Sequence, residues 1–283
     1  MKEIQINSLL LHSNSGSPTY VVKTPIEGLE YPEIRLSKYS RVGEYGAIIP
    51  NTLYDGRHIT LQGYVLASTS AEYEQARRAL QGALAISKDA NNKVQPHTLK
   101  MTTMDDVALQ CEVFVRSFQM HVNHVIGGEF FLDLYAPDYP LYSQSLSSSS
   151  LSRITSGGFV LPVVLPIIST ATTGGVAIVT NNGTSESFPT ITISGPMTNP
   201  IIQNTTLGRY VQLNITIQTG EQALIDMRNK TVTRDGQSVI QNKVAGSQFW
   251  WLNPGDNTIK VQSSSGSDQG AVQVSYRHAY IGV

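Results

Sequence analysis

The chain has 283 residues and one cysteine, and its 20 lysines and arginines against 21 aspartates and glutamates give a formal net charge of −1 at pH 7. A single cysteine excludes an intramolecular disulfide, and a near-neutral chain has no overall field that would draw nucleic acid or an anionic membrane. The length predicts two domains, each large enough to bury its own core.

The residue types indicate a mainly β protein that does not insert into a membrane. Only 14% of the residues are charged, and weakly charged chains rich in β-branched residues usually form extensive β-sheet. The most apolar stretch, Phe159–Ile168, is ten residues long and is interrupted by two prolines, whereas a membrane-spanning helix needs about 20 residues. The amino-terminal residues lack the apolar core and cleavage site of a signal peptide, so we expect a soluble chain.

Residues 4–66 are predicted to form short strands joined by polar turns. Thr19–Thr24 is one candidate, and Arg57–Ala67 is the clearest, because every second position of a strand lies on the same face. The positions that share this face are Ile59, Leu61, Gly63 and Val65. The stretch Arg41–Gly56 carries three glycines, a proline and the tight-turn signal Tyr-Asp-Gly, and we expect turns there.

One amphipathic helix is predicted over Ser70–Ile86. Thr69 and Glu72 have the spacing of a capping box, in which the hydroxyl and the carboxylate each accept a hydrogen bond from an amide at the helix start. Apolar residues then recur with helical spacing and form one stripe. The stripe consists of Tyr73, Ala76, Leu80, Ala83 and Leu84. We expect this helix to lie on a sheet and to be the only substantial helix.

Strands resume between residues 98 and 142, and Cys111 in one of them is expected to be a buried, unreactive thiol. Serine then dominates residues 143–158, where all periodicity is lost, and a flexible linker is predicted. The predicted domains are therefore residues 1–142 and residues 159–283.

The second domain is predicted to be a β-sandwich or jelly roll. Short strands recur there at intervals of about 8–12 residues, each closed by glycine, proline, asparagine or aspartate. Apolar and polar residues alternate in these strands, as a half-buried sheet requires. The apolar positions include Ile191, Ile193, Val211, Leu213, Ile215 and Ile217.

The sequence contains several groups of residues that could form a catalytic or metal-binding site, but each is explained more simply by a solvated or structural role. The groups considered are the carboxylates Asp105, Asp106, Asp133 and Asp138, the histidines His121 and His124, and the trio Asn253, Asp256 and Asp268. The carboxylates are more simply solvated than a glycosidase pair, the histidines would face opposite sides of a strand, and the trio lacks the spacing of a calcium loop. With no nucleophile elbow and no phosphate-binding glycine motif, we predict no enzyme activity, no catalytic residues, no cofactor and no metal.

Both tryptophans lie side by side in Phe249–Val261. Paired aromatic residues beside a loop can form a platform for a sugar or anchor a β-sandwich. Strand alternation places Phe249 with Trp251 on one face and Trp250 with Leu252 on the other, followed by a Pro-Gly turn and a return strand. We predict that Trp251 fills the core, because it pairs with Phe249, and that Trp250 lies on the outer face.

Six short motifs follow one another in the second half of the chain. They are Asn182/Gly183, Pro189/Ile191/Ile193/Gly195, Asn199/Pro200/Ile202, Gly220/Glu221/Leu224/Asp226, Val232/Gly236 and Leu252/Pro254/Gly255/Asn257/Ile259. In this order and spacing they resemble the carboxy-terminal tail-component domain of the distal tail proteins (Dit) of long-tailed, non-contractile bacteriophages. Tyr45–Val65, followed by a helix with Arg77, Arg78 and Leu80, is similar to the first domain of that family.

The resemblance implies a fold and a role. The fold would be an amino-terminal β-sandwich-like domain with one helix, which assembles into a hexameric ring, and a carboxy-terminal galectin-like β-sandwich. The role would be a structural hub of the virion tail tip, made in the cytoplasm of the bacterial host. Its partners would be the tail tube protein, a tail-associated lysin or tail hub protein, and receptor-binding proteins, and DNA would only pass through the lumen. The chain is too short for the large inserted modules of some members, which favours a scaffold.

Two other classes of function are weighed against this hub. A carbohydrate-binding module that adheres to host cell-wall sugars would use exposed aromatic residues such as Tyr139, Tyr142 and Trp250, although such residues are more often packing or interface anchors. A cell-wall-degrading enzyme is disfavoured, because no catalytic pair is found.

Overall fold

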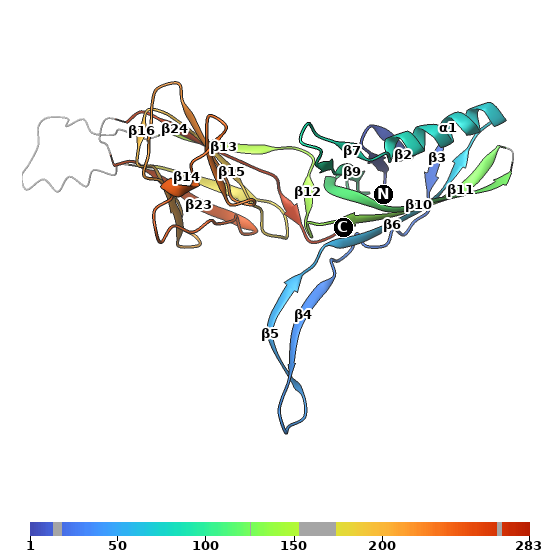
Figure 1. Ribbon diagram of the computed structural model, residues 1–283, viewed down its shortest axis with the longest axis horizontal. Coiled ribbons are helices and arrows are strands. Elements are labelled where there is room, and N and C mark those ends of the chain that lie inside the picture. The colour runs from blue at the N-terminus through green and yellow to red at the C-terminus, as the bar shows by residue number, and fades with distance from the viewer. Residues whose placement is uncertain (14–18, 125, 153–173, 265–267) are drawn as a thin grey trace, which may run out of the picture. The chain divides into compact units, whose positions relative to one another are not determined.

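The computed structural model describes residues 1–13, 19–124, 126–152, 174–264 and 268–283 (Figure 1). These residues form two compact units, the first comprising Met1–Ser145 with Tyr280–Val283 and the second comprising Leu146–Ala279. Both units are mainly β, as predicted, and α1 (Ser70–Ala83) is the one α-helix within the described ranges.

The first unit is built on a sheet with the strand order β2-β1-β9-β10-β11-β6-β3. Residues 108–113 of β10 pair with β9 and residues 114–124 pair with β11, so this long strand joins the two halves of the sheet. The strands are β1 (Glu3–Ile6), β2 (Leu9–Ser13), β3 (Tyr20–Val22), β6 (Arg57–Leu66), β9 (His97–Thr102), β10 (Ala108–His124) and β11 (Gly127–Ala136), with β12 (Leu141–Ser143) beside β10 and a separate pair β7 (Ser87–Lys88) and β8 (Val94–Gln95). Burial alternates along β6 and β11, which confirms the predicted period of two.

Helix α1 covers this core with its predicted apolar stripe. Tyr73, Ala76 and Leu80 are buried, and the Tyr20 hydroxyl of β3 donates a 2.7 Å hydrogen bond to the Ala76 carbonyl. At the helix start, the Thr69 hydroxyl accepts from the Glu72 amide, as a capping box requires. The helix ends at Ala83 rather than at Ile86, with Leu84 as its C-cap residue.

A two-stranded hairpin, β4 (Ile34–Ser40) with β5 (Ala47–Tyr54), extends away from this sheet (Figure 1). It replaces much of the predicted turn region 41–56. The expected turn residues do form turns, since Gly43 and Gly46 adopt positive φ angles at the hairpin tip and the Gly56 amide donates to the Asp55 carboxylate before β6. The prediction missed the strand between these two turns.

The second unit consists of two main sheets that enclose one core. Their strand orders are β13-β24-β15-β20-β21-β22 and β14-β23-β17-β18, and β16 pairs with β19. The strands are β13 (Ser147–Ser152), β14 (Gly174–Asn181), β15 (Thr190–Ser194), β16 (Met197–Thr198), β17 (Ile201–Asn204), β18 (Arg209–Gln212), β19 (Thr216–Ile217), β20 (Gln222–Asp226), β21 (Thr231–Arg234), β22 (Gln237–Ser238), β23 (Gly255–Gln262) and β24 (Ala271–Tyr276), with one 3-10 turn at Ile240–Asn242. Buried residues of both sheets, such as Ile191, Val274, Ile202 and Val261, belong to a single hydrophobic cluster. This arrangement is a β-sandwich.

The interpretation of residues 143–158 as a flexible linker is wrong for Ser147–Ser152. This segment is strand β13, which pairs with β24 at an edge of the larger sheet and buries Leu151 in the core. A run of serines carries no apolar alternation, so composition alone did not reveal the strand. Residues 153–158 lie outside the described residues. The two units divide between Ser145 and Leu146.

The end of the chain also departs from the predicted boundary of the second domain at residue 283. The chain re-enters the first unit at Tyr280, within β25 (Ala279–Tyr280). The last four residues therefore pack with the sheet formed by the first half of the sequence.

Candidate functional site

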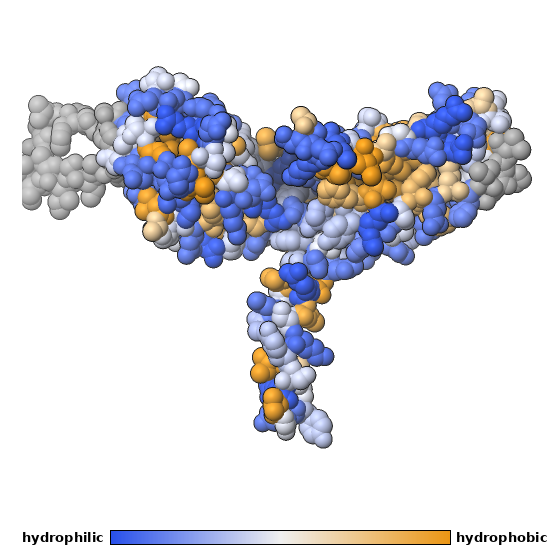
Figure 2. Space-filling view, in the orientation of Figure 1, coloured by the Kyte–Doolittle hydropathy of each residue, from blue (hydrophilic) through white to orange (hydrophobic). Residues whose placement is uncertain are grey.

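The β4–β5 hairpin exposes many large apolar side chains. Every residue of β4 and all but the first of β5 are exposed, and Figure 2 shows apolar side chains along the hairpin. The exposed large apolar residues are Ile34, Leu36, Tyr39, Val42, Tyr45, Ile48, Ile49, Leu53 and Tyr54. Leu53 and Tyr54 are consecutive in the regularly paired part of β5 and so point to opposite faces. Both faces of the hairpin therefore present apolar side chains to solvent.

A group of tyrosines braces the base of this hairpin. The Tyr31 and Tyr54 hydroxyls are 3.0 Å apart, and the Tyr54 ring stacks on Tyr139 with ring centroids 4.8 Å apart. Tyr139 was one of the aromatic residues considered for stacking on a sugar, and here it packs against the hairpin.

Arg57, the first residue of β6, lies directly beyond the hairpin and is 1% exposed. Its guanidinium donates to the carbonyls of Tyr139, Gly28, Leu29 and Ile281. Burial lowers the pKa of this guanidinium to about 10, which still leaves it charged at neutral pH. One buried cation thus ties three segments near the hairpin base to the last residues of the chain.

The structure reverses the predicted roles of the two tryptophans. Trp250 is 0% exposed and lies in the core of the sandwich, where its indole N–H donates to the Ile202 carbonyl at 3.4 Å. Trp251 is half-buried and lies beneath the Arg209 guanidinium, 4.3 Å from the ring centroid. The alternation was predicted correctly, because Trp250 shares its burial with Leu252, but the wrong face was assigned to the core.

The hairpin predicted around Pro254 is also not formed. Residues 247–251 are outside any strand, and β23 pairs with β14 and β17 instead. The buried Asn257 side chain holds the turn, since its Oδ1 accepts from the Asn253 amide and its Nδ2 donates to the carbonyls of Asn253 and Gly255. The asparagine of this motif therefore has a structural role.

Two neighbouring residues explain another of the motifs. A Cβ atom on Gly183 would lie 1.8 Å from the Ala279 carbonyl oxygen, so only glycine fits. The side chain of Asn181 is fully buried. Its Nδ2 donates to the Ser185 carbonyl at 2.7 Å, and its Oδ1 accepts from the backbone amide of Gly183 at 3.1 Å. The sequence comparison assigned the asparagine of this motif to Asn182. In the structure the side chain that makes these hydrogen bonds belongs to Asn181, two residues before Gly183.

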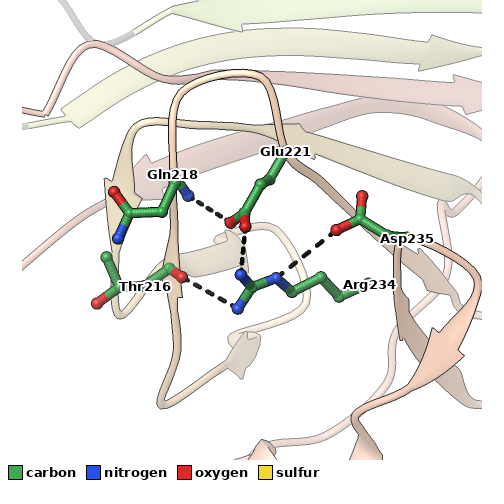
Figure 3. Close-up of polar contacts among 5 residues, drawn as sticks. All are labelled: Thr216, Gln218, Glu221, Arg234 and Asp235. Carbon is green, nitrogen blue, oxygen red and sulfur yellow. Dashed lines mark hydrogen bonds and ion pairs between the residues drawn. The ribbon is translucent and has the colours of Figure 1, made fainter.

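Glu221 and Arg234 fix the turn that precedes β20 (Figure 3). The Glu221 carboxylate accepts from the Gln218 amide at 2.7 Å and from the Arg234 guanidinium at 2.5 Å. Arg234 also donates to the Thr216 carbonyl at 3.4 Å and lies 3.8 Å from the Asp235 carboxylate. The glutamate of the fourth motif therefore holds this turn in place.

This clamp predicts a pH-dependent contribution to stability. The hydrogen bond from the Gln218 amide, and then that from Arg234, hold the pKa of Glu221 below its ordinary value. Such a carboxylate stabilises the fold fully above the ordinary pKa, and the contribution is lost as the pH falls through the lowered pKa. We expect Glu221→Gln to lower the melting temperature at pH 7 and to change it less at about pH 3, as measured by thermal unfolding. An equal change at both pH values would contradict this role.

The carboxylates considered as a catalytic pair have other contacts. Asp106 forms an ion pair with Lys2 at 2.5 Å, and Asp133 lies 3.6 Å from Arg116. Each contact lies at the surface of the first unit, and neither brings two carboxylates to one cavity.

The residues considered for a metal are likewise engaged elsewhere. His121 lies edge-on to Phe131 at 5.7 Å, and the side chain of His124 lies outside the described residues. In the second unit, Asn253 accepts from Trp251, Asp256 from Thr180 and Asp268 from Thr198. Within the described parts of the chain, no group of three or more histidine, cysteine, aspartate or glutamate residues could hold a metal ion.

Cys111 is buried, as predicted, and burial raises the pKa of its thiol to about 12. A thiol that stays protonated at neutral pH is a poor nucleophile. None of the helices in the described ranges is long and apolar enough to cross a bilayer.

Comparison with known proteins decides the family of the second unit. Residues 182–280 match the family model described as the siphovirus-type tail component, C-terminal domain. The chain carries a siphovirus-type tail component domain. The resemblance of its motifs to the distal tail proteins is thereby confirmed, and the buried Asn257 and the Glu221 clamp lie inside the matched range.

One solved structure extends the similarity to the whole fold. The crystal structure of the SPP1 Dit protein is 15% identical to this chain, covers 98% of both chains and has a TM-score of 0.66. A structure of the phage P2 baseplate in its activated conformation with calcium is 9% identical, covers 96% of this chain and 97% of the other, and has a TM-score of 0.49. No curated protein sequence matches the chain. The tail component domain is thus part of a chain that has the fold of SPP1 Dit.

Proposed function

We propose that this chain is the structural hub of a phage tail tip or baseplate, a hexameric ring that joins the tail tube to tail-tip and receptor-binding components. The tail component domain at residues 182–280 supports a tail role. The similar SPP1 Dit protein is described as a hub of the adsorption apparatus of phages that infect Gram-positive bacteria. The observation on this molecule that carries the proposal is the exposed β4–β5 hairpin.

The hairpin supports self-assembly because it is poorly suited to remain in water. A two-stranded hairpin is marginally stable alone, its outer edges offer unpaired backbone groups, and exposed apolar patches usually mark interfaces. A ring of identical subunits needs a head-to-tail contact in which a projecting element of one copy meets a different surface of the next. In this proposal the hairpin supplies the projecting half of that contact.

The remaining parts of the proposal follow from this ring. The first unit, with its sheet and α1, would form the ring, and the second would be a galectin-like sandwich, with the tail tube protein and a tail-associated lysin or tail hub protein as neighbours in the virion. DNA would pass through the lumen, and the net charge of −1 is compatible with passage without strong phosphate binding. The role needs no catalysis, cofactor, metal or membrane insertion.

An assembly experiment on the hairpin tests this function. Ile48, which is 53% exposed, is replaced by aspartate, and the oligomeric state is measured by light scattering after size exclusion. The wild-type chain should form a six-chain species at high concentration. The Ile48→Asp variant should be monomeric at the same concentration, because a carboxylate cannot be buried unpaired in an apolar contact.

The matched control is Ile178→Asp on β14 of the second unit, since Ile178 is 64% exposed. This variant should assemble like the wild type. If both aspartate variants assemble normally, the hairpin is not the interface. If both fail equally, added charge alone disrupts assembly and the hairpin is not special.

The alternative of a carbohydrate-binding module loses support from two of the aromatic residues considered for it. Trp250 is fully buried and offers no ring face to a sugar. Tyr139 stacks with Tyr54. The structural hub is therefore the function that we propose.

A further inference from the structure

A cavity of about 390 Å³ opens on the first unit beside the turn that joins β9 to β10. Its walls are mainly apolar. The apolar lining residues are Met1, Met104, Val107, Leu109, Tyr280 and Val283. Met104 is 66% exposed, and a methionine side chain adapts its shape to the group that it contacts. The cavity is large enough to accept an apolar side chain from another molecule.

The tip of the β4–β5 hairpin (residues 38–46) presents apolar side chains of this kind. Val42 and Tyr45 are fully exposed, at 101% and 103%. The turn that carries them is tight, because Gly43 and Gly46 adopt φ angles of 75° and 100°, which glycine reaches without strain. The hairpin tip therefore holds two apolar side chains outside the core of its own chain.

The proposed ring requires a receiving surface for the hairpin. In a head-to-tail contact, the projecting element of one copy meets a different surface of the next copy. The hairpin extends away from the sheet of the first unit (Figure 1), and none of its residues lines the cavity of its own chain. The hairpin tip and the cavity are thus two different surfaces of one unit, as such a contact needs.

The hairpin tip carries a net positive charge. Lys38 and Arg41 supply two cations, and Glu44 supplies the one carboxylate of residues 38–46, which leaves a net charge of +1. Glu44 lies 3.5 Å from Arg41, but this ion pair is between exposed side chains, and such pairs are weak. The Arg41 guanidinium can therefore also contact a carboxylate of another chain.

The rim of the cavity is acidic. Asp105 lines the cavity, and a hydrogen bond from the Thr103 hydroxyl holds the pKa of the Asp105 carboxyl below its ordinary value. Asp106 follows it and pairs with the Lys2 ammonium at 2.5 Å, and Glu3 on the neighbouring β1 adds another carboxylate. Charges at the two chain ends that line the cavity are opposite in sign and cancel. Three carboxylates thus face one ammonium, which complements the positive hairpin tip.

We propose that the hairpin tip of one copy inserts Val42 and Tyr45 into this cavity of the next copy, with Arg41 facing Asp105. The contact buries two side chains that are otherwise fully in water, and the opposite charges around it set its orientation. This assignment rests on the proposed ring and identifies the surface that receives the hairpin.

Chemical cross-linking of the full chain tests the contact. Glu44→Cys and Met104→Cys are combined in one chain, so that Val42 and Tyr45 stay in place, and the protein is treated with a short bismaleimide. We expect a ladder of covalently linked chains that ends at six on a denaturing gel. Cys111 should not react, because it is buried and burial raises the pKa of its thiol to about 12.

The matched control combines Glu44→Cys with Ile178→Cys, because Ile178 is 64% exposed and lies on the second unit. This control should give no ladder. A six-chain species by native mass spectrometry without a ladder from the Glu44–Met104 pair would overturn the proposed contact and leave the hub intact. A ladder that continues beyond six chains would support the contact and contradict the closed ring of six.

A charge exchange in the otherwise wild-type chain tests the same contact without added cysteines. Arg41→Asp and Asp105→Lys should each raise the concentration needed for assembly by at least about tenfold, and the double variant should recover most of that loss. A structural effect on either turn would not be rescued by the other substitution. If the double variant assembles no better than the weaker single variant, or if neither single variant changes assembly, the proposal is overturned.

Discussion

Replacing Trp250 by alanine is expected to lower the free energy of unfolding of the second unit by about 3–5 kcal/mol. Trp250 is 0% exposed, is the largest fully buried side chain and donates a hydrogen bond to the Ile202 carbonyl. Its removal would leave a cavity between the two sheets. Urea unfolding followed by far-UV circular dichroism measures the change, because the substitution also alters tryptophan fluorescence.

The adjacent Trp251 is the matched control. It is half-buried, the Arg209 guanidinium stacks on its ring, and its indole N–H donates to the Asn253 side chain. Such a stack contributes about 0.5–2 kcal/mol, so Trp251→Ala should destabilise the unit by much less than Trp250→Ala. Equal losses for the two variants, or a larger loss for Trp251→Ala, would show that the core has been assigned to the wrong tryptophan.

Replacing Arg57 by methionine is expected to destabilise the first unit by about 3 kcal/mol or more. Methionine fills a similar volume but donates no hydrogen bonds, so the carbonyls of Gly28, Leu29 and Ile281 would lose their shared donor. Lysine should not rescue the fold, because its ammonium is a compact point charge and cannot span the same acceptors. Chemical denaturation measures the loss, and hydrogen exchange should rise at residues 28–29 and 281–283.

Arg78→Met provides the control for this substitution. Arg78 lies on the exposed side of α1, where such a change usually alters stability by less than about 0.5 kcal/mol. If Arg57→Met were as well tolerated as Arg78→Met, the buried guanidinium would not be holding the end of the chain in place.

The alternation of apolar and polar residues and the helix-capping residues predicted much of the fold, because both signals depend only on residues that are close in sequence. The period of two in β6 and the Thr69–Glu72 pair before α1 each describe one element with one buried face. These signals did not predict the β4–β5 hairpin, because neither of its faces is buried against the rest of the first unit. Strand β13 escaped because serine carries no apolar signal and only Leu151 is buried in the core.

Local sequence patterns could not predict which of the two tryptophans is buried in the core. Alternation correctly separated Trp250 from Trp251, but both faces of this segment are aromatic or apolar. The choice between them depends on Arg209, which reaches Trp251 from β18, and on Lys243, 5.9 Å from the Phe249 ring centroid. Such cation–ring contacts join residues that are distant in sequence, so no local pattern contains them.

The residues of the candidate sites were hidden for the same reason. Arg57 was counted as an ordinary strand residue, although a charged residue at a position in phase with Ile59 and Leu61 could have signalled a buried cation. Seven residues line a cavity of about 400 Å³ beside Trp251, and they lie between positions 188 and 251. Only the folded sandwich brings them together.

The central claim, that this chain forms a closed ring of six copies, is tested most directly by native mass spectrometry of the wild-type protein together with negative-stain images of the same sample. We expect a six-chain species and six-fold rings with an open centre at high protein concentration. A chain that stays monomeric at every concentration, with no ring in any image, would contradict it.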